Sequence, residues 1–349
     1  MAGDSTRRPA AAASGAAPHS PAQTSPPTMI PAMRSIEAQL LHRPSGLTAG
    51  EIVHRLGAMQ AQDVPAALLA FRARSATLTP ADVEAAWHAR EIVRTWGPRG
   101  TLHFTHAGDL PWIHALTRRD TNILRRLREE GVTAGDPLGL IARTLEGQGP
   151  LTKADLEDRL AGRAHGQGIV ALVALAAYHG LAVLGPLRAG KPTYVHAADW
   201  LGAPIVPEPD RERALKELAV RYRRAHHPAT PEDLAAWSGL PLGQARTAWR
   251  LSGDEPPPAR EGPVTRLLPA FDEFLMGWRS RDPILDPEYA KQVFPGGGML
   301  RPVVLVDGVI RGVWGRTGAR VSVRPFEQLP DGLLDDELGD VRRFFAREP

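Results

Sequence analysis

Two glutamines, Gln60 and Gln62, flank a single alanine, and Asp63 follows them directly. A side-chain amide is neutral and cannot act as an ordinary general base, but it both donates and accepts hydrogen bonds. Two amides at this spacing can therefore hold a water molecule or a sugar in a fixed position. The competing interpretation is that both are surface residues, because polar side chains commonly end an amphipathic helix.

A run of polar residues at 99–103 could bind phosphate. Arg99, Thr101 and His103 surround a glycine where the sequence predicts the tip of a hairpin. Arginine and threonine side chains at such a tip are suitable ligands for the DNA backbone, so we expect all three residues to contact DNA. The alternative is a charged turn beside a cross-strand histidine.

A second basic group lies further along the chain. Arg279 and Arg281 follow Trp278, and Arg301 comes shortly after the glycine triplet at 296–298. We expect these three arginines to contact DNA as well. Glycines let the backbone approach a ligand closely, but the triplet lacks the Lys-Ser/Thr of a phosphate-binding P-loop, so nucleotide binding is not expected.

The residue types that are missing narrow the chemistry. The sequence has no cysteine, which excludes disulfides, thiol nucleophiles, iron–sulfur clusters and cysteine-based zinc sites. The histidines lack the spacing of metal ligands and are expected to be solvated loop residues. The Walker, GxSxG, HExxH and EF-hand patterns are also missing. We therefore expect neither a metal nor a cofactor.

Helices capped by threonine must position the glutamines. Thr48, with Glu51 three residues later, matches a capping box that starts a helix leading to Gln60. Thr79, followed by a proline at the first helical position, starts another helix. The apolar residues change to a strand-like period over 92–104, on both sides of a Gly-Pro-Arg-Gly turn. Three helices followed by a small hairpin are the outline of a winged helix, a variant of the helix-turn-helix.

The same order of elements occurs twice more. Thr152 and Thr230 each begin a helix, and the first of them is followed by a strongly apolar helix and a strand pair that turns near Gly190. The C-terminal part differs, since it contains alternating runs and Asp307-Gly308, a strong hairpin signal. A terminal helix ends the pattern.

We therefore predict a mainly α fold with small β-hairpins or sheets (α+β), built from tandem winged-helix modules with a β-rich C-terminal region. The N-terminal segment is rich in alanine, proline and serine and lacks the apolar stretch of a signal peptide. The predicted units are a disordered tail (1–33), a first module that carries the glutamines (34–135), a second module (136–206), and a third module with a β-rich cap (207–349).

The sequence also resembles a known family. The phrases RLGAMQAQD, RTWGPRGTLHF, RLLPAFDEFLMGWRSRD and GGGMLRPVVLVDG-VIRGVW follow the order found in winged-helix DNA glycosylases of the AlkZ/YcaQ type. The resemblance covers roughly residues 33–330. It implies tandem winged helices in a C-shaped arrangement around DNA. It also implies monofunctional excision of cationic N7-alkylated purines, including bulky adducts and interstrand crosslinks.

The family's catalytic motif is a glutamine, an apolar residue, and then a second glutamine or an aspartate. Gln60-Ala61-Gln62 matches the Gln-x-Gln branch, which resembles enzymes of self-resistance to DNA-alkylating natural products. Alkylation at guanine N7 leaves a cationic base that departs without protonation, so what remains is to hold a water against C1′. The resemblance thus implies that Gln60 and Gln62 position water and sugar. Ala61 is smaller than the bulky residue common at this place, which implies a different pocket shape.

Other functions remain compatible with the sequence. A non-catalytic winged-helix DNA-binding protein or transcriptional regulator would share the modules and the basic hairpins. A glycosylase with a catalytic aspartate would use Asp63 or Asp272. A bifunctional glycosylase-lyase needs an amine nucleophile, and all four lysines lie outside the expected site.

The composition agrees with a DNA-binding protein without demanding one. Only four of the 42 cationic residues are lysine, which leaves 38 arginines, and the net charge is +3. Arginine suits phosphate and base recognition, although a GC-rich genome favours it as well. We expect a monomer that acts on double-stranded DNA with alkylated bases, binds no membrane, and works in the cytoplasm in association with the nucleoid.

Overall fold

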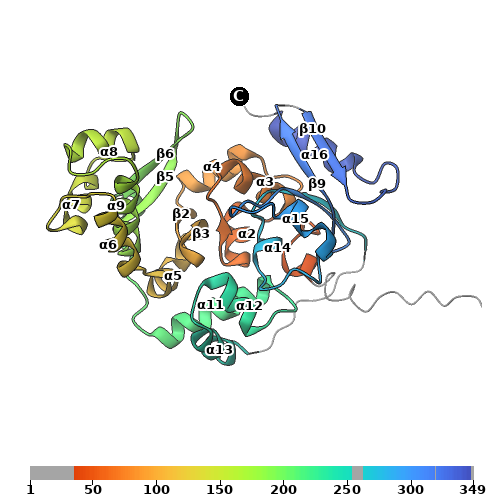
Figure 1. Cartoon of the computed structure of the whole chain (residues 1–349), viewed down its shortest axis with the longest axis horizontal. Helices are drawn as coiled ribbons and strands as arrows, with labels where there is room; N and C mark the ends of the chain where they lie inside the picture. Colours follow the sequence, from red (N-terminus) through yellow and green to blue (C-terminus); the bar gives the residue numbers. More distant parts are fainter. Residues whose placement is uncertain (1–34, 254–261, 319, 347–349) are drawn as a thin grey trace, which may run out of the picture.

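Figure 1 shows the computed structural model of the chain, which describes residues 35–253, 262–318 and 320–346. Helices make up 48% and strands 17% of it, which confirms the predicted mainly α fold with small sheets. The predicted disordered tail at 1–33 lies outside the described residues. Within the described ranges, no helix combines the length and the apolar character needed to cross a membrane.

The elements that carry the glutamines are three helices and three short strands. Thr48 and Thr79 form the predicted capping boxes, with Glu51 and Asp82 as their partners. β1 and β3 are antiparallel neighbours, and the order helix, strand, two helices and hairpin is one that we interpret as a winged helix. The elements are α2 (Ala49–Leu56), β1 (Met59–Gln60), α3 (Val64–Arg74), α4 (Pro80–His88), β2 (Ile92–Trp96) and β3 (Leu102–His106).

The helix before Gln60 ends earlier than the sequence predicted. α2 stops at Leu56, because Gly57 adopts a φ of 80° and ends the helix. Met59 and Gln60 then pair with β3 as a short strand. The prediction that Gln60 and Gln62 end an amphipathic helix was therefore wrong. They belong to a segment that is extended because the edge of β3 offers it hydrogen bonds.

A second group of elements repeats this order and shares the sheet. β4 pairs with β6 just as β1 pairs with β3. Arg94 of β2 pairs with Leu184 of β5, so one antiparallel sheet runs through both groups in the order β1-β3-β2-β5-β6-β4. We call the two groups module 1 and module 2. The second contains α7 (Pro137–Leu145), β4 (Leu151–Thr152), α8 (Lys153–Leu160), α9 (Gly166–Tyr178), β5 (Ala182–Arg188) and β6 (Lys191–His196).

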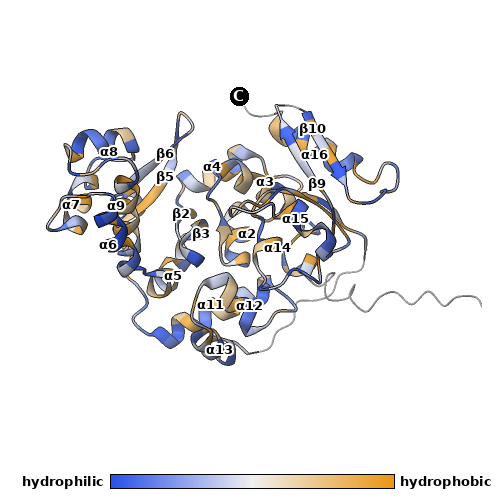
Figure 2. Cartoon of the chain, viewed as in Figure 1, coloured by the Kyte–Doolittle hydropathy of each residue, from blue (hydrophilic) through white to orange (hydrophobic). Residues whose placement is uncertain are grey.

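The core of module 2 surrounds a single helix. α9 is apolar on all sides, and ten of its 13 residues are buried, so it must lie at the centre of this module. Figure 2 shows the consequence, since β5 is strongly hydrophobic whereas the outer helix α6 is hydrophilic. Two helices connect the modules, α5 (Leu110–Thr117) and α6 (Asp120–Glu129).

The remaining chain forms three helices and a second sheet. After α10 (Ala197–Leu201) come α11 (Arg211–Ala225), α12 (Pro231–Ser238) and α13 (Leu242–Leu251). The sheet has the order β10-β9-β8-β7, and Asp307 and Gly308 both have positive φ at its predicted hairpin turn. Its strands are β7 (Thr265–Leu268), β8 (Val303–Val306), β9 (Val309–Thr317) and β10 (Arg320–Pro325). The helices around it are α14 (Glu273–Met276), α15 (Ala290–Val293) and α16 (Asp335–Phe345).

Two buried arginines fix α3 to the C-terminal region. Arg74 makes hydrogen bonds of 2.8 and 2.9 Å to the two carboxylate oxygens of Asp272. Arg72 pairs with Glu337 at 3.1 Å and with Asp340 at 2.7 Å. Both arginine side chains are fully buried, so each charge must be balanced where it lies. The first pair holds α14, and the second holds α16, beside α3, the helix that follows the glutamines. The boundaries of the three predicted modules stay predictions.

Candidate active site

The Gln60-Ala61-Gln62 segment has two faces. Residues two apart in an extended chain point to the same side, which places Gln60 and Gln62 toward the turn of the β2–β3 hairpin. Ala61 points the other way and is fully buried in the core of module 1 with Phe71 and Phe104. The pattern Gln-apolar-Gln is therefore that of an edge segment with one buried face. The size of residue 61 accordingly bears on core packing rather than on the shape of a pocket.

Gln60 is held by both its backbone and its side chain. Its backbone N–H donates to Glu273 Oε1 at 2.8 Å, and its side-chain Oε1 accepts from Arg99 Nη2 at 3.0 Å. Because a guanidinium can only donate, this contact fixes which end of the amide is oxygen. The Gln60 Nε2 has no acceptor among the described residues, so its two N–H groups are free to bind something else.

The Gln62 side chain is exposed, but its amide is oriented like that of Gln60, with the oxygen toward a protein donor. Its side-chain Oε1 accepts from the backbone N–H of Leu102 at 3.2 Å, which again leaves Nε2 without a protein partner in the described chain. Arg94 fixes the backbone, since it donates to the carbonyls of Ala61 at 2.9 Å and Gln62 at 3.3 Å. The Ala61 N–H reaches the Leu102 carbonyl at 2.7 Å. The pair is therefore preorganised before any ligand binds.

Arg99 connects the hairpin turn to the rest of the site. It lies in the 3-10 turn Pro98–Gly100 with a φ of 57°, an uncommon value for a residue other than glycine. Its Nη1 donates to the Trp237 carbonyl at 2.6 Å while Nη2 holds Gln60. Burial lowers the pKa of Arg99, and the nearby Glu273 carboxylate opposes that shift. Both terminal nitrogens thus already have acceptors inside the protein, which the sequence-based expectation of a phosphate contact did not foresee.

Glu273 is the functional candidate that sequence reasoning missed. Its carboxylate is 1% exposed and accepts from the Gln60 N–H through Oε1 and from the Trp237 indole N–H through Oε2, at 2.9 Å. Burial raises the pKa of Glu273, and the Arg99 charge is the largest opposing effect. The available signal was an acidic residue inside the apolar run FDEFLM. Its partners could not be read from the sequence, because they lie 36 and 213 positions away.

The two aspartates considered as catalytic groups have different environments. Asp272 is buried, binds Arg74 through both oxygens and caps α14, so its carboxylate is used in contacts that stabilise the fold. Asp63 is exposed and caps α3 through one long hydrogen bond of 3.5 Å to the Ala66 N–H. Of these two carboxylates, Asp63 is therefore the one that could reach a ligand.

The other residues predicted from the 99–103 run lie deeper than expected. His103 is fully buried, and its Nδ1 bonds to the Thr101 carbonyl at 2.9 Å. Burial lowers the pKa of His103 to about 3, so the ring is neutral. The structure does not support DNA contact by His103, because a side chain without exposed surface cannot reach a phosphate. Thr101 is half-buried, and its hydroxyl donates to the Pro98 carbonyl at 3.3 Å.

No hydrogen bond among the described residues joins the second basic group to the glutamines. Burial lowers the pKa of Arg281, and the charge of Arg99 lowers it further, so this one arginine lies near the arginine that binds Gln60. Arg279 and Arg301 are exposed, and Arg301 donates to the Gln292 carbonyl at 3.3 Å. Arg281 makes more contacts inside the protein, since its Nε donates to the Leu275 carbonyl and its guanidinium lies 5.2 Å from the centre of the Phe294 ring. DNA binding by these three arginines remains a prediction.

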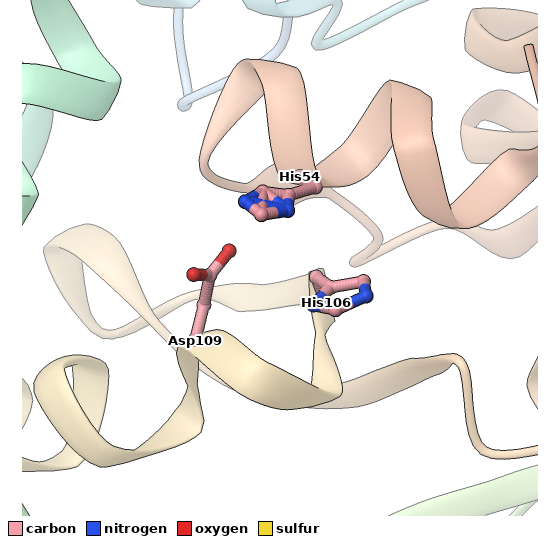
Figure 3. A group of neighbouring side chains, drawn as sticks. All are labelled: His54, His106 and Asp109. Carbon is pink, nitrogen blue, oxygen red and sulfur yellow. The ribbon is translucent and has the colours of Figure 1, made fainter.

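His54, His106 and Asp109 form a separate polar group between α2 and the end of β3 (Figure 3). Their ligand atoms lie within 4.8 Å of one another, whereas tetrahedral ligands of zinc at 2.1 Å would be about 3.4 Å apart. The Asp109 carboxylate already pairs with Arg221 at 3.0 Å. Arg221 also donates to the His54 carbonyl at 2.8 Å, so the group is best explained as a clamp between α11 and module 1.

Comparison with known proteins defines the class of this site. Residues 53–346 match the model of a family described as DNA glycosylase AlkZ-like. The chain is accordingly a DNA glycosylase, an enzyme that hydrolyses N-glycosyl bonds. It belongs to the AlkZ-like family, as the four sequence phrases implied.

Two relatives support this assignment over nearly the whole chain. An interstrand DNA cross-link repair glycosylase of Streptomyces sahachiroi is 27% identical over an alignment of 348 residues. The alignment covers 88% of this chain and 94% of the relative. The solved structure of Streptomyces sahachiroi DNA glycosylase AlkZ superposes with a TM-score of 0.73 at 25% identity, covering 91% of this chain and 96% of that one. The non-catalytic regulator considered from the sequence is therefore not supported.

Proposed function

We propose that this enzyme releases cationic N7-alkylated purines from double-stranded DNA, including bulky adducts and interstrand crosslinks, by hydrolysis without strand cleavage. The observation that carries the proposal is the pair of neutral amides, Gln60 and Gln62, whose oxygens are held by protein donors. The name of the Streptomyces sahachiroi relative supports the crosslink part, since that protein is an interstrand cross-link repair glycosylase.

The chemistry of the substrate explains why neutral amides suffice. A purine alkylated at N7 is already positively charged, so the C1′–N9 electron pair leaves with the base and neutralises it. Water then adds its oxygen to C1′ and releases one proton to solvent. The enzyme needs no strong acid for this step, but it must place the water and favour the positive charge that develops on the sugar. Fixed amide dipoles can do the first of these.

Gln62 is the residue that we assign to the water. It is exposed, so a water can reach its free Nε2 and the second lone pair of its Oε1. Gln60 is nearly buried and presents only its Nε2, which suits a sugar or phosphate oxygen. An exposed position also lets the enzyme act on a bulky or crosslinked base in place, because such a base cannot rotate freely into a closed pocket.

Arg99 and Glu273 are positioning residues in this proposal. Arg99 withdraws electron density from the Gln60 amide by binding its oxygen, which makes the Nε2 hydrogens stronger donors. Glu273 fixes the Gln60 backbone and holds the Trp237 indole. Both terminal nitrogens of Arg99 and both carboxylate oxygens of Glu273 make hydrogen bonds inside the protein, so we assign each residue to act through Gln60.

The four lysines argue for hydrolysis without lyase chemistry. A lyase forms a Schiff base between an amine and C1′, and within the described residues no lysine makes a hydrogen bond to the glutamines or to the residues that hold them. We therefore expect abasic DNA with intact strands as the product.

The decisive experiment offers the purified protein three duplexes, with N7-methylguanine, a bulky N7 adduct, or an N7–N7 crosslink. We expect base release that leaves strands unbroken until alkali is added. Gln62→Ala should reduce single-turnover release at least 100-fold while affinity for the same DNA changes less than threefold. Gln148→Ala is the matched control, because Gln148 is an exposed glutamine in the α7–β4 connection.

Retention of full activity by Gln62→Ala would remove this residue from the reaction. Asp63→Asn decides whether the neighbouring carboxylate takes the proton released by water. A rate loss as large as that of Gln62→Ala would move the assignment to a catalytic aspartate, and an unchanged rate would leave it with the amides.

A further inference from the structure

Arg119 is a half-buried cation without a counterion near the glutamines. Its Nε is fully buried and has no hydrogen-bond partner, and no acceptor among the described residues contacts the guanidinium. The adjacent Arg118 differs, since it is exposed and pairs with Asp120. The two terminal nitrogens differ from Nε, because they are not fully buried and they also make no hydrogen bond within the described residues. An acceptor from outside the protein can therefore reach the guanidinium through these nitrogens.

The Arg119 side chain packs against two glycines, Gly100 and Gly239. A Cβ on Gly100 would lie 3.2 Å from Arg119 Nε, and a Cβ on Gly239 would lie 2.7 Å from Arg119 Nη2. Both glycines have positive φ, so another residue there would be strained and would crowd the guanidinium. Gly100 follows Arg99 in the hairpin turn, and Gly239 follows α12. The guanidinium therefore lies between these two segments, next to the arginine that orients Gln60.

Tyr178 supplies a second donor at the same place. Its hydroxyl would lie 3.1 Å from a Cβ on Gly100, and it makes no hydrogen bond within the described residues although the side chain is 5% exposed. Burial raises the pKa of Tyr178, and Arg119 opposes the shift. The hydroxyl is therefore protonated at neutral pH and can donate. Two unpartnered donors from α9 and the start of α6 thus meet at the hairpin of module 1.

We propose that Arg119 and Tyr178 bind a phosphate of the DNA backbone beside the nucleotide on which the glutamines act. A guanidinium and a hydroxyl are a common pair of phosphate donors. The acid that follows in the chain, Asp120, does not occupy the site, because Arg118 and His179 pair with its carboxylate. The inference rests on the proposed function only in taking duplex DNA as the ligand, and it is independent of the lesion.

The test measures affinity for an undamaged duplex over a series of salt concentrations. Arg119→Gln should weaken binding about tenfold near 0.1 M salt and lower the slope of log K against log salt by about one. Arg119→Lys should keep the slope and lose only a few-fold in affinity, since the charge remains. Tyr178→Phe should weaken binding about threefold without changing the slope. Arg143→Gln, an equivalent charge change on the exposed face of α7, is the control.

Two results would overturn the proposal. The first is wild-type affinity and slope in Arg119→Gln. The second is unchanged affinity with slower base release at saturating enzyme, which would make Arg119 a support for the hairpin turn. A wild-type protein that binds duplex DNA but releases no base would contradict the proposed function and leave this phosphate site standing. Melting temperatures of the variants show whether each one folds.

Discussion

Modules 1 and 2 have the same elements in the same order, yet the glutamine pair to which we assign the reaction lies in module 1. In each module a two-residue strand pairs with the second strand of a hairpin, β1 with β3 and β4 with β6. The two hairpins even join in one sheet through Arg94 and Leu184. The comparison therefore isolates small differences on a shared framework.

The first difference is the junction between the short strand and the next helix. In module 2, β4 ends at Thr152, and this residue itself caps α8 through a capping box. In module 1, β1 ends at Gln60 but the cap of α3 is Asp63, so Ala61 and Gln62 intervene. These two residues continue along the edge of β3 and bring a second amide to the side of the first. The side chains that we propose to act on DNA thus lie in a two-residue extension, whereas module 2 passes directly from its strand into a helix.

The second difference is the environment of the hairpin turn. In module 2 the turn at Ala189 and Gly190 is exposed, and nothing lies within 4 Å of a Cβ at Gly190. In module 1 the turn is packed between α12 and Arg119, and its arginine donates inward. The hairpin turn is thus exposed to solvent in module 2, whereas in module 1 it is packed against other parts of the protein.

The largest effect that would test this comparison comes from Arg99. Arg99→Met should slow base release about 100-fold, because a small misplacement of an aligned group can cost that much. Affinity for undamaged duplex and its salt slope should stay near those of the wild type, since the guanidinium is used inside the protein. Single-turnover kinetics and salt-dependent anisotropy measure the two quantities.

Arg188→Met provides the matched control in the other hairpin, where the arginine is exposed and pairs with Asp155. It should leave base release unchanged. If Arg99→Met instead kept the rate and lost about one unit of salt slope, Arg99 would be a phosphate contact, as its hairpin position alone suggests.

The next largest effect should be a loss of stability at acidic pH that comes from buried histidines outside module 2. Burial lowers the pKa of His103 and His226 to about 3 and that of His114 to about 4, whereas no histidine between residues 137 and 196 is buried. These folded pKa values lie below the unfolded one near 6.5, so the unfolded chain binds more protons as the pH falls. The contribution of these histidines to the free energy of unfolding is therefore fully present above about pH 6.5. Below that pH it decreases by about 1.4 kcal/mol per pH unit for each histidine.

Urea unfolding at pH 7.5 and 5.5 measures this loss. His103→Asn should reduce the difference between the two pH values by about 1.4 kcal/mol, while His165→Asn, at an exposed site in module 2, should leave it unchanged. A pH dependence that is the same in both variants would show that His103 is not the neutral buried group assigned here.

The smallest effect concerns the caps. Thr152→Ala should cost about 1 kcal/mol of stability, because it removes the hydroxyl that accepts from the Asp155 N–H in a capping box, and should not slow base release. Asp63→Ala should cost less, since its cap rests on one hydrogen bond of 3.5 Å. Thermal unfolding and single-turnover release report the two properties. Loss of activity in Thr152→Ala would show that the module 2 junction has a function of its own.

The sequence by itself determined the features that depend on near neighbours. Thr48, Thr79, Thr152 and Thr230 were all expected to cap helices, and all do so, because a cap needs only a side chain and a backbone group three residues away. The turn at Asp307-Gly308 follows equally from local backbone preferences. The family phrases likewise predicted the glycosylase family, which the comparisons confirm.

Only the tertiary structure decided how the glutamines are held. The apolar spacing before Gln60 suited a helix, and the segment became extended because β3, some forty residues later, presents an open edge. Glu273 comes from a distant helix, and the inward direction of Arg99 depends on the Trp237 carbonyl. Hydrogen-bond partners and burial arise from which segments meet in space. No local pattern specifies them, and they turn two ordinary polar residues into an oriented pair.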